Sequence, residues 1–245
     1  MTSEKIVLGV HGVSKKFGGL LAVDNMEFGV REHEVLGLIG PNGSGKTTMM
    51  NLISGALKLT SGHITLQGAR ISGLAANEIN RRGVARTFQL VKMLPTMTVL
   101  ENVVAGAVFG HKRRWGHEAE TFAHQLLGKV GIDGIAEAPV SSLTYIDQKR
   151  LELARVLASE PEILLLDEWL AGLNPTELST GIDLIKALRA EGRTIILVEH
   201  VMDAIRSLCD QCVVMNTGRK IAEGTPAEVL ADPEVIRAYL GDDDA

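Results

Sequence analysis

The apolar residues of this chain follow two patterns, and each pattern predicts a different kind of element. Short apolar runs separated by glycines and charged residues, at 6–8, 26–30 and 63–67, predict strands of a small, largely antiparallel sheet. Apolar residues three or four positions apart predict helices instead. Such helices are expected at residues 74–82, 98–108, 118–130, 151–157 and 178–190. Residues 90–140 are therefore mostly helical and are expected to form an inserted sub-domain.

Uninterrupted apolar runs predict strands that are buried on both faces, as in a parallel sheet covered by helices. These runs lie at residues 35–39, 163–166 and 195–198. Residues 84–89 predict a further strand, and residues 213–222 predict a closing hairpin around Thr217 and Gly218. Two short helices near Pro226 and Pro233 and a frayed tail at 242–244 should follow. The whole pattern predicts an α/β protein with a mostly parallel sheet.

The residues after the first buried run form a loop of the kind that binds phosphate. Residues 40–48 match the pattern G-x-x-x-x-G-K-[ST] and lie between a predicted strand and a predicted helix, as this pattern requires. Glycines let the backbone curl so that N–H groups point inward, and the helix adds its positive end. Lys46 can reach the β- and γ-phosphates, and Thr47 can ligate magnesium. The expected nucleotide contacts are Gly40, Pro41, Asn42, Gly43, Ser44, Gly45, Lys46, Thr47 and Thr48.

Acidic and imidazole side chains end the other two buried runs. Asp167 and Glu168 follow one run, and His200 follows the next. Because α/β sheets bind their ligands at the carboxyl ends of the strands, these side chains are expected beside the phosphates. Paired acids at this position suit a magnesium ion and an attacking water. The histidine, at the matching end of a neighbouring strand, is expected near the γ-phosphate.

The composition indicates a globular protein without a basic surface. Of the 245 residues 45% are hydrophobic and 22% are charged, and the formal net charge is −5, so no overall basic field favours nucleic acid. No run of about 18 apolar residues could span a membrane, and the first residues lack the apolar core of a signal peptide. We therefore expect a cytoplasmic protein that reaches a membrane only by docking on a partner that spans it.

The two cysteines, Cys209 and Cys212, allow two interpretations. Their C-x-x-C spacing suits a redox pair or half of a zinc site. The alternative is a pair of small buried residues, since Cys209 ends a predicted helix and Cys212 opens an apolar run. The sequence has no second cysteine pair to complete a metal site, which favours the second interpretation.

The order of these motifs resembles that of the ATP-binding subunits of ABC transporters, over nearly the whole chain. The resemblance rests on residues 40–48, Gln89, residues 164–168, Asn174 and His200. The chain is also similar to the branched-chain amino-acid importer ATPases of the LivG type, at residues 17–23, 86–89, 171–175, 198–200 and 235–241. The family implies a single ABC ATPase domain over residues 1–245, with a P-loop NTPase core, an antiparallel β sub-domain and a helical sub-domain at about residues 90–160.

The resemblance implies a role for each of these positions. ATP would be held between two ATPase subunits, with the ring of Phe17 stacked on the adenine. From the sequence alone this ring, in a turn-like segment at 15–19, could equally belong to the core. Glu168 would polarise the attacking water, and His200 would contact the γ-phosphate. Magnesium would be held by Thr47, Gln89 and, through water, Asp167.

The same resemblance implies partners at a membrane. A second ATPase subunit, identical or different, would complete each ATP site, and integral-membrane permease subunits would dock on the helical region. A periplasmic or extracellular solute-binding protein would take part indirectly, and no nucleic acid is expected. The chain would then be peripheral on the inner face of the cell membrane and would power the import of branched-chain or other hydrophobic amino acids.

Two positions depart from the family pattern. The signature that is offered to the partner's ATP aligns with Leu143, Thr144, Tyr145, Ile146 and Asp147, and Ile146 replaces a glycine. A β-branched side chain there adds bulk and stiffens the turn, so we expect unequal ATP sites in a heterodimer, or a weak homodimeric ATPase. Trp169 stands where the family has proline, and it either disturbs the nearby loop or simply packs.

Three alternative functions follow from these observations. Importers for urea, amides or other small solutes have similar ATPases, and the solute does not contact this subunit. A catalytically weak regulatory subunit could hold ATP with little turnover because of Ile146 and Trp169. A soluble ABC ATPase of ribosomes or DNA repair is disfavoured, since the chain has neither a second cassette nor a long coiled coil.

Overall fold

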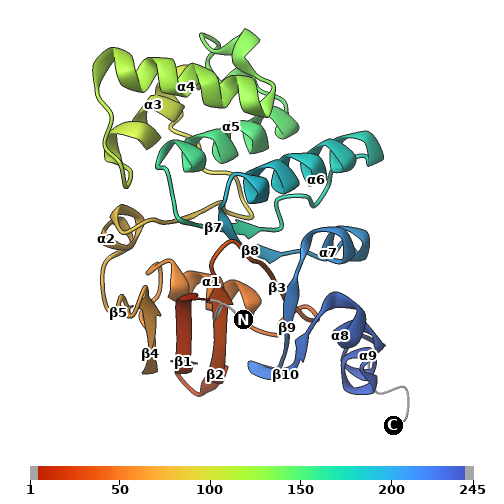
Figure 1. The fold of residues 1–245 in the computed structure, drawn as a ribbon. Helices are drawn as coiled ribbons and strands as arrows, with labels where there is room; N and C mark the ends of the chain where they lie inside the picture. The colour runs from red at the N-terminus through yellow and green to blue at the C-terminus, as the bar shows by residue number, and fades with distance from the viewer. Residues whose placement is uncertain (1–4, 241–245) are drawn as a thin grey trace.

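The computed structural model describes residues 5–240 and contains two β-sheets (Figure 1). The four-stranded antiparallel sheet has the order β2-β1-β4-β5, with β1 (Ile6–Phe17), β2 (Leu20–Arg31), β4 (Ser61–Leu66) and β5 (Ala69–Arg70). The six-stranded sheet has the order β10-β9-β3-β8-β7-β6, with β3 (Val35–Ile39), β6 (Val84–Arg86), β7 (Ile163–Asp167), β8 (Thr194–Val198), β9 (Gln211–Asn216) and β10 (Arg219–Gly224). This α/β architecture confirms the predicted fold class. The tail expected at 242–244 lies outside the described residues.

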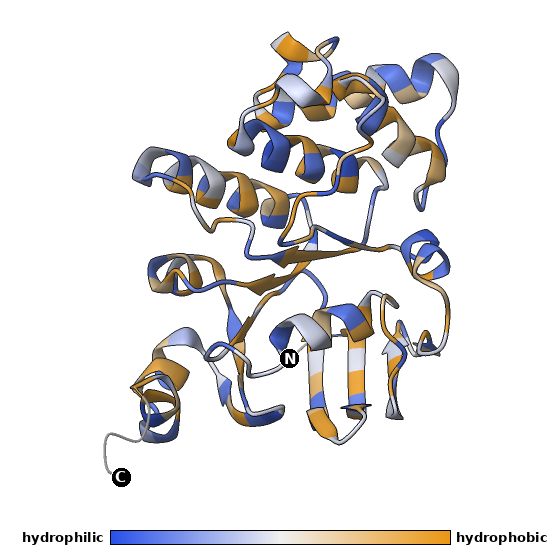
Figure 2. Cartoon of the chain, turned by 180° about the vertical axis from the view of Figure 1, so that it is seen from behind, coloured by the Kyte–Doolittle hydropathy of each residue, from blue (hydrophilic) through white to orange (hydrophobic). Residues whose placement is uncertain are grey.

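The three uninterrupted apolar runs form the centre of the six-stranded sheet. β3, β7 and β8 are buried at every position, and β8 pairs in parallel with β3 and with β7. They are the orange strands across the middle of Figure 2. Asp167 of β7 pairs with Val198 of β8, so the two strands end side by side. The side chains that follow these strands therefore meet at one edge of the sheet.

Helices surround this sheet and gather in one additional group. In Figure 1, α3 (Val99–Phe109), α4 (Gly116–Val130) and α5 (Tyr145–Ala158) lie together on one side of the molecule. The capping box predicted for α3 is present: the Thr98 hydroxyl accepts the Glu101 N–H at 3.2 Å, and the Glu101 carboxylate accepts the Thr98 N–H at 2.8 Å. The other helices are α1 (Lys46–Ile53), α2 (Ala76–Arg81), α6 (Pro175–Ala190), α7 (Met202–Leu208), α8 (Pro226–Ala231) and α9 (Pro233–Leu240), with 3-10 turns at Asp133–Ile135 and Val140–Ser142.

The segment around Phe17 is strand rather than turn, which corrects the prediction. Lys15, Lys16 and Phe17 pair with β2, and the turn begins only at Gly18. The polar side chains of this segment gave no apolar pattern, but its backbone is satisfied by pairing with the neighbouring strand. Phe17 therefore sits at the tip of a hairpin, and the residue is 44% exposed.

Strand β6 is shorter than predicted, because it ends at Arg86 rather than at Gln89. Thr87 still donates its N–H to the carbonyl oxygen of Leu165 at 3.0 Å. The next N–H, that of Phe88, turns to the carboxylate of Glu152 on α5. The chain thus leaves the sheet just before Gln89, which places this side chain on a loop.

The fold also bears on the predictions about membrane-spanning helices and about the two cysteines. Within residues 5–240 no helix is both long and apolar enough to cross a bilayer.

Cys209 and Cys212 are buried and form no disulfide, and hydrogen bonding to Cys212 together with burial raises the pKa of the Cys209 thiol. A thiol with a raised pKa is poorly reactive, which supports the interpretation as small buried residues.

Candidate nucleotide site

The phosphate-binding loop runs from the end of β3 into α1, as predicted. Gly40 and Gly45 have φ angles of +146° and +104°, a region that residues with side chains rarely adopt. A Cβ atom at Gly40 would lie 2.0 Å from the carbonyl oxygen of Met215, and one at Gly45 would lie 2.6 Å from that of Ala22. Both positions therefore require glycine, for backbone angle and for space. The loop then enters α1, whose free N–H groups favour an anion.

Lys46 brings a positive charge into this loop. Its side chain is buried, and its ammonium donates to the carbonyl oxygens of Gly40 and Pro41 at 2.7 and 2.9 Å. Burial lowers the pKa of Lys46, whereas the nearby Glu168 and Asp167 raise it. An ammonium has three donors, so these two hydrogen bonds leave one for a phosphate oxygen.

A pocket of about 550 Å³ opens over the loop. Its walls include residues 42–48, Gln89, Glu168 and the exposed ring of Phe17, so most of the predicted nucleotide contacts meet here. Gly40 and Pro41 lie outside the walls and act instead on Lys46. Thr217 and Gly218 also line the pocket, which the sequence did not indicate. Gly218 reaches it from the turn between β9 and β10 by donating its N–H to the carbonyl oxygen of Ser44 at 2.9 Å.

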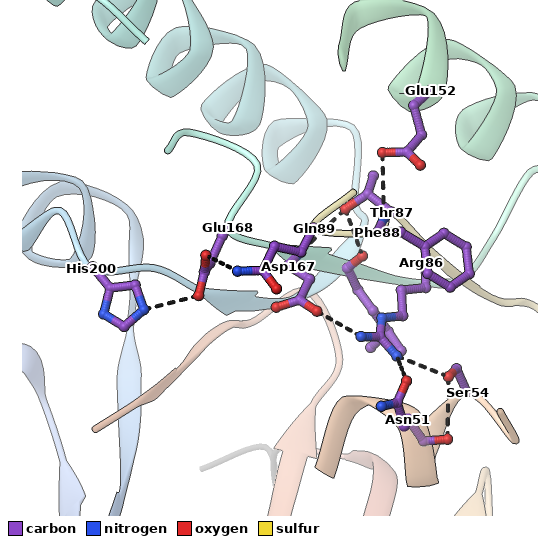
Figure 3. Close-up of polar contacts among 11 residues, drawn as sticks. Asn51, Ser54, Arg86, Thr87, Phe88, Gln89, Glu152, Asp167, Glu168 and His200 are labelled. Atoms are coloured by element: carbon purple, nitrogen blue, oxygen red, sulfur yellow. Dashed lines mark hydrogen bonds and ion pairs between the residues drawn. The ribbon is translucent and has the colours of Figure 1, made fainter. Parts of the chain in front are cut away.

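The carboxylate of Glu168 is held between two side chains at this pocket (Figure 3). The amide of Gln89 donates to its Oε2 at 2.8 Å, and Nε2 of His200 lies 2.9 Å from its Oε1. Glu168 also has a φ of +51°, which is uncommon for a residue with a side chain. The structure thus brings together the three residues predicted to be catalytic, from the ends of β7 and β8 and from the loop after β6.

Asp167 is more deeply buried than Glu168 and has one oxygen without a protein partner. Its Oδ2 pairs with the guanidinium of Arg86 at 2.6 Å, and Arg86 also binds Asn51 of α1 at 2.6 Å (Figure 3). Its Oδ1 is buried and has no hydrogen-bond partner. Magnesium is usually bound by one or two protein groups together with phosphate oxygens and water. The unpartnered oxygen of Asp167 and the hydroxyl of Thr47 in the pocket wall fit such an ion.

The last three of the five signature residues form the first turn of α5, the other two directly precede it, and all five lie outside the walls of this pocket. The hydroxyl of Thr144 caps the helix by accepting the N–H of Asp147 at 3.3 Å, and it donates to the carboxylate of Asp147 at 2.6 Å. Tyr145 is 54% exposed, and Ile146 is half-buried within the first helical turn. Since Ile146 lies in a regular helix, what distinguishes it from glycine is the bulk of its side chain. The structure does not bring residues 143–147 to this chain's own phosphate loop.

Two more buried side chains support the loop after β7. Trp169 is packed in the core, and its indole N–H donates to the carbonyl oxygen of Lys149 at 3.1 Å. Of its two interpretations, disturbance of the nearby loop or simple packing, the structure supports packing. The N–H of Leu170 donates to Oε1 of Glu199 at 2.6 Å. Burial raises the pKa of Glu199 to about 7, although this N–H and the charge of Lys149 lower it. Arg86, Lys149 and Glu199 were missed because each pairs with residues far away in the sequence.

Two protein-family models match the sequence. The ABC transporter model matches residues 23–171, and a model for branched-chain amino acid ATP-binding cassette transporters matches residues 219–245. The high-affinity branched-chain amino acid transport ATP-binding protein LivG of Salmonella typhimurium is 43% identical over 250 residues, which cover 96% of this chain and 98% of that protein. The similarly described protein BraF of Pseudomonas aeruginosa is 40% identical over 253 residues, with coverages of 96% and 98%.

Solved structures of ATP-binding cassettes share the fold. The ADP conformation of MJ1267, an ATP-binding cassette of an ABC transporter, has a TM-score of 0.88 and 29% identity, and the match covers 97% of this chain and 100% of that chain. A nucleotide-free ATP-binding cassette from an ABC transporter has a TM-score of 0.87 at 29% identity, with coverages of 97% and 100%. The similarity thus extends over both sheets and the helical group.

Proposed function

Because the chain belongs to the ABC transporter ATPase family, we propose that it hydrolyses ATP to power an importer of branched-chain or other hydrophobic amino acids. The observation that carries this proposal is the Glu168 carboxylate, which Gln89 and His200 hold beside the phosphate-binding loop. The relatives LivG and BraF, which match over 98% of their length, are ATP-binding proteins of branched-chain amino acid transport.

In the proposed reaction a water attacks the γ-phosphate of ATP, and ADP and phosphate leave. The N–H groups of residues 40–48 and the ammonium of Lys46 bind the phosphates, and the ring of Phe17 stacks on the adenine. Glu168 orients the water and accepts its proton, while Gln89 and His200 keep the carboxylate in place. Thr47, Gln89 and, through water, Asp167 would hold magnesium, which when bound would supply positive charge to the phosphates.

The proposed assembly contains a second ATPase subunit and a permease. Residues 143–147 lie apart from this chain's own pocket, which supports a role at the nucleotide of a partner subunit. A groove of about 340 Å³, whose walls include Phe88, Leu94 and Phe109, supports docking of a permease on the helical side of the molecule. Phe109 is 68% exposed there, as an apolar docking site requires. The subunit would then be peripheral on the inner face of the membrane, with a solute-binding protein acting on the other side.

The alternative solutes are urea, amides and other small polar molecules. Importers for these solutes have similar ATPases, and the solute is bound by other subunits. Co-purification of the permease and the binding protein with this chain, followed by solute-binding measurements, separates the two classes. Binding of leucine, isoleucine or valine supports the proposal, whereas binding of urea or an amide contradicts it.

The substitution Glu168→Gln tests the proposed reaction. It keeps the size of the side chain but removes the proton acceptor, so phosphate release should fall about 100-fold or more. The affinity for a fluorescent ATP analogue should change little, because residues 40–48 still bind the phosphates. Phosphate release and analogue binding are measured for both proteins, with Glu137→Gln at an exposed glutamate as the matched control. Wild-type protein that binds ATP but releases no phosphate, even when assembled with its permease, would favour the regulatory alternative.

A further inference from the structure

Helix α5 carries two buried side chains of opposite charge that the proposed reaction does not use. Lys149 and Glu152 are three residues apart, so they are neighbours on the helix surface, and they are only 3% and 1% exposed. Burial of a charged group is unfavourable unless hydrogen bonds compensate for the lost water. Neither residue lines the nucleotide pocket. The role of these two side chains follows instead from their hydrogen-bond partners.

Lys149 binds the loop that carries Glu168. Its ammonium donates to the carbonyl oxygens of Glu168, Trp169 and Ala171 at 3.3, 3.0 and 2.6 Å. Since an ammonium has three donors, this loop uses all of them. The indole N–H of Trp169 donates in return to the backbone carbonyl of Lys149 at 3.1 Å. Helix and loop are thus joined in both directions.

Glu152 binds the segment that carries Gln89 (Figure 3). Its Oε2 accepts the N–H of Phe88 and its Oε1 accepts the N–H of Lys92, both at 3.3 Å. These two N–H groups lie on either side of Gln89 in the sequence. The carboxylate therefore fixes the backbone from which the Gln89 side chain extends.

The two segments meet at the proposed catalytic carboxylate. Gln89 donates to Glu168 at 2.8 Å, so both partners of this hydrogen bond belong to segments whose backbones are bound to α5. The φ of +51° at Glu168 is unfavourable for a residue with a side chain, and such a conformation persists only when the surroundings impose it. Lys149, bound to the carbonyl oxygen of Glu168 itself, supplies such a constraint.

We propose that Lys149 and Glu152 are positioning residues for Glu168 and Gln89. The inference rests on the proposed function, and it assigns the alignment of the hydrolytic site to a helix outside the pocket. The same helix begins at Tyr145, within residues 143–147, which the proposed dimer presents to the ATP of the partner subunit. When contact with the partner's ATP shifts α5, the segments that carry Glu168 and Gln89 move with it. One helix thereby links the nucleotide of the partner subunit to Glu168 of this chain.

The substitution Lys149→Met tests the first contact, because it keeps the length of the side chain but removes its three donors. The single-turnover rate of ATP hydrolysis should fall about 100-fold, as expected when reacting groups lose alignment. The affinity for a fluorescent ATP analogue should change by less than about twofold, because a residue that acts only on alignment leaves binding intact. Lys149→Arg keeps the charge and the donors and should recover much of the rate. Lys186→Met, at an exposed lysine of α6, is the matched control and should keep the wild-type rate.

The substitution Glu152→Gln tests the second contact with almost unchanged shape. The amide offers one oxygen to two N–H groups, so its NH2 group faces one of them and the segment around Gln89 shifts. We expect the single-turnover rate to fall about tenfold at unchanged ATP affinity. Melting temperatures without nucleotide show whether each variant is folded. If Lys149→Met does not fold, the rate of Glu152→Gln alone tests whether α5 positions the catalytic residues.

The outcomes separate this inference from the proposed function. Wild-type rates in both variants, or a loss of ATP affinity as large as the loss of rate, would overturn the inference, and so would loss of folding in both. A wild-type protein without ATPase activity, or full activity in Glu168→Gln, defeats the proposed function whatever happens at α5. Combining Lys149→Met with Glu168→Gln should add little to the loss from Glu168→Gln alone, since Lys149 acts through Glu168.

Discussion

At the scale of single residues, Glu199 shows how one buried carboxyl makes stability depend on pH. Burial raises its pKa from 4.5 to about 7, against the smaller effects of the Leu170 N–H and of Lys149. The folded chain thus holds this proton more tightly than the unfolded chain does. The stabilisation that results is complete below about pH 4.5 and is lost as the pH rises to about 7.

We expect Glu199→Gln to remove this part of the pH dependence. Between about pH 4.5 and 7, the free energy of unfolding of the wild type should fall relative to the variant by roughly 3 kcal/mol. Urea unfolding at a series of pH values measures the difference, with Glu137→Gln at an exposed glutamate as the control. A difference between wild type and Glu199→Gln that stays constant over this range would show that Glu199 is ionised in the same way in both states.

Local sequence identified the residues proposed to act on the nucleotide but not the buried residues that hold them in place. Lys46, Asp167 and Glu168 stand in a loop pattern or at the end of an apolar run, so their neighbours in sequence point to them. Arg86 and Lys149 stand in segments that look like ordinary strand and helix. Their burial depends on acceptors that only the folded chain brings near, and no local pattern records those acceptors.

At the scale of elements, the loop between β3 and α1 depends on glycine for its shape. A Cβ atom at Gly45 would lie 2.6 Å from the carbonyl oxygen of Ala22. Gly45→Ala should therefore distort the loop and lower the affinity for a fluorescent ATP analogue about tenfold or more. Gly128→Ala is the matched control, since a Cβ atom there would meet nothing within 4 Å on helix α4. That control should bind ATP normally and gain about 1 kcal/mol in stability. Normal ATP binding by Gly45→Ala would show that the loop tolerates a side chain.

Strands that are buried at every position could be predicted from the sequence. β3, β7 and β8 contain the uninterrupted apolar runs, because a strand covered on both faces needs mostly apolar side chains. The capping box at Thr98 likewise marked the start of α3. The prediction was wrong where tertiary contacts decide the boundary, as at Phe17, which pairs with β2, and at Phe88, which is drawn out of the sheet by Glu152.

At the scale of the whole molecule, the proposed dimer places Ile146 at the nucleotide of the partner subunit rather than in this chain's own pocket. We expect Ile146→Gly to raise hydrolysis at the site of the partner subunit by about tenfold, because closer approach of α5 improves its alignment with the phosphate. Ile146→Ala should do nearly as well, since Ile146 lies in a regular helix and only its bulk is removed. If the partner is a different ATPase, both variants are assayed in the assembled transporter together with Glu168→Gln in this chain, so that the hydrolysis measured belongs to the partner's site. In a homodimer they are assayed without Glu168→Gln, because that substitution would remove activity from both sites. Unchanged hydrolysis in both variants would show that the two sites were not made unequal by Ile146.

The turn at Thr217 and Gly218 also determines when the pocket can exist. Gly218 binds the phosphate loop through Ser44 and the first hairpin through Asp24, at 2.9 and 2.8 Å, and β3 lies between β8 and β9. During translation the loop leaves the ribosome long before the strands that flank it and before the turn that closes its pocket. A complete pocket is therefore available only after synthesis has passed Gly218. A chain that ends before Gly218 therefore lacks one wall of the proposed nucleotide pocket.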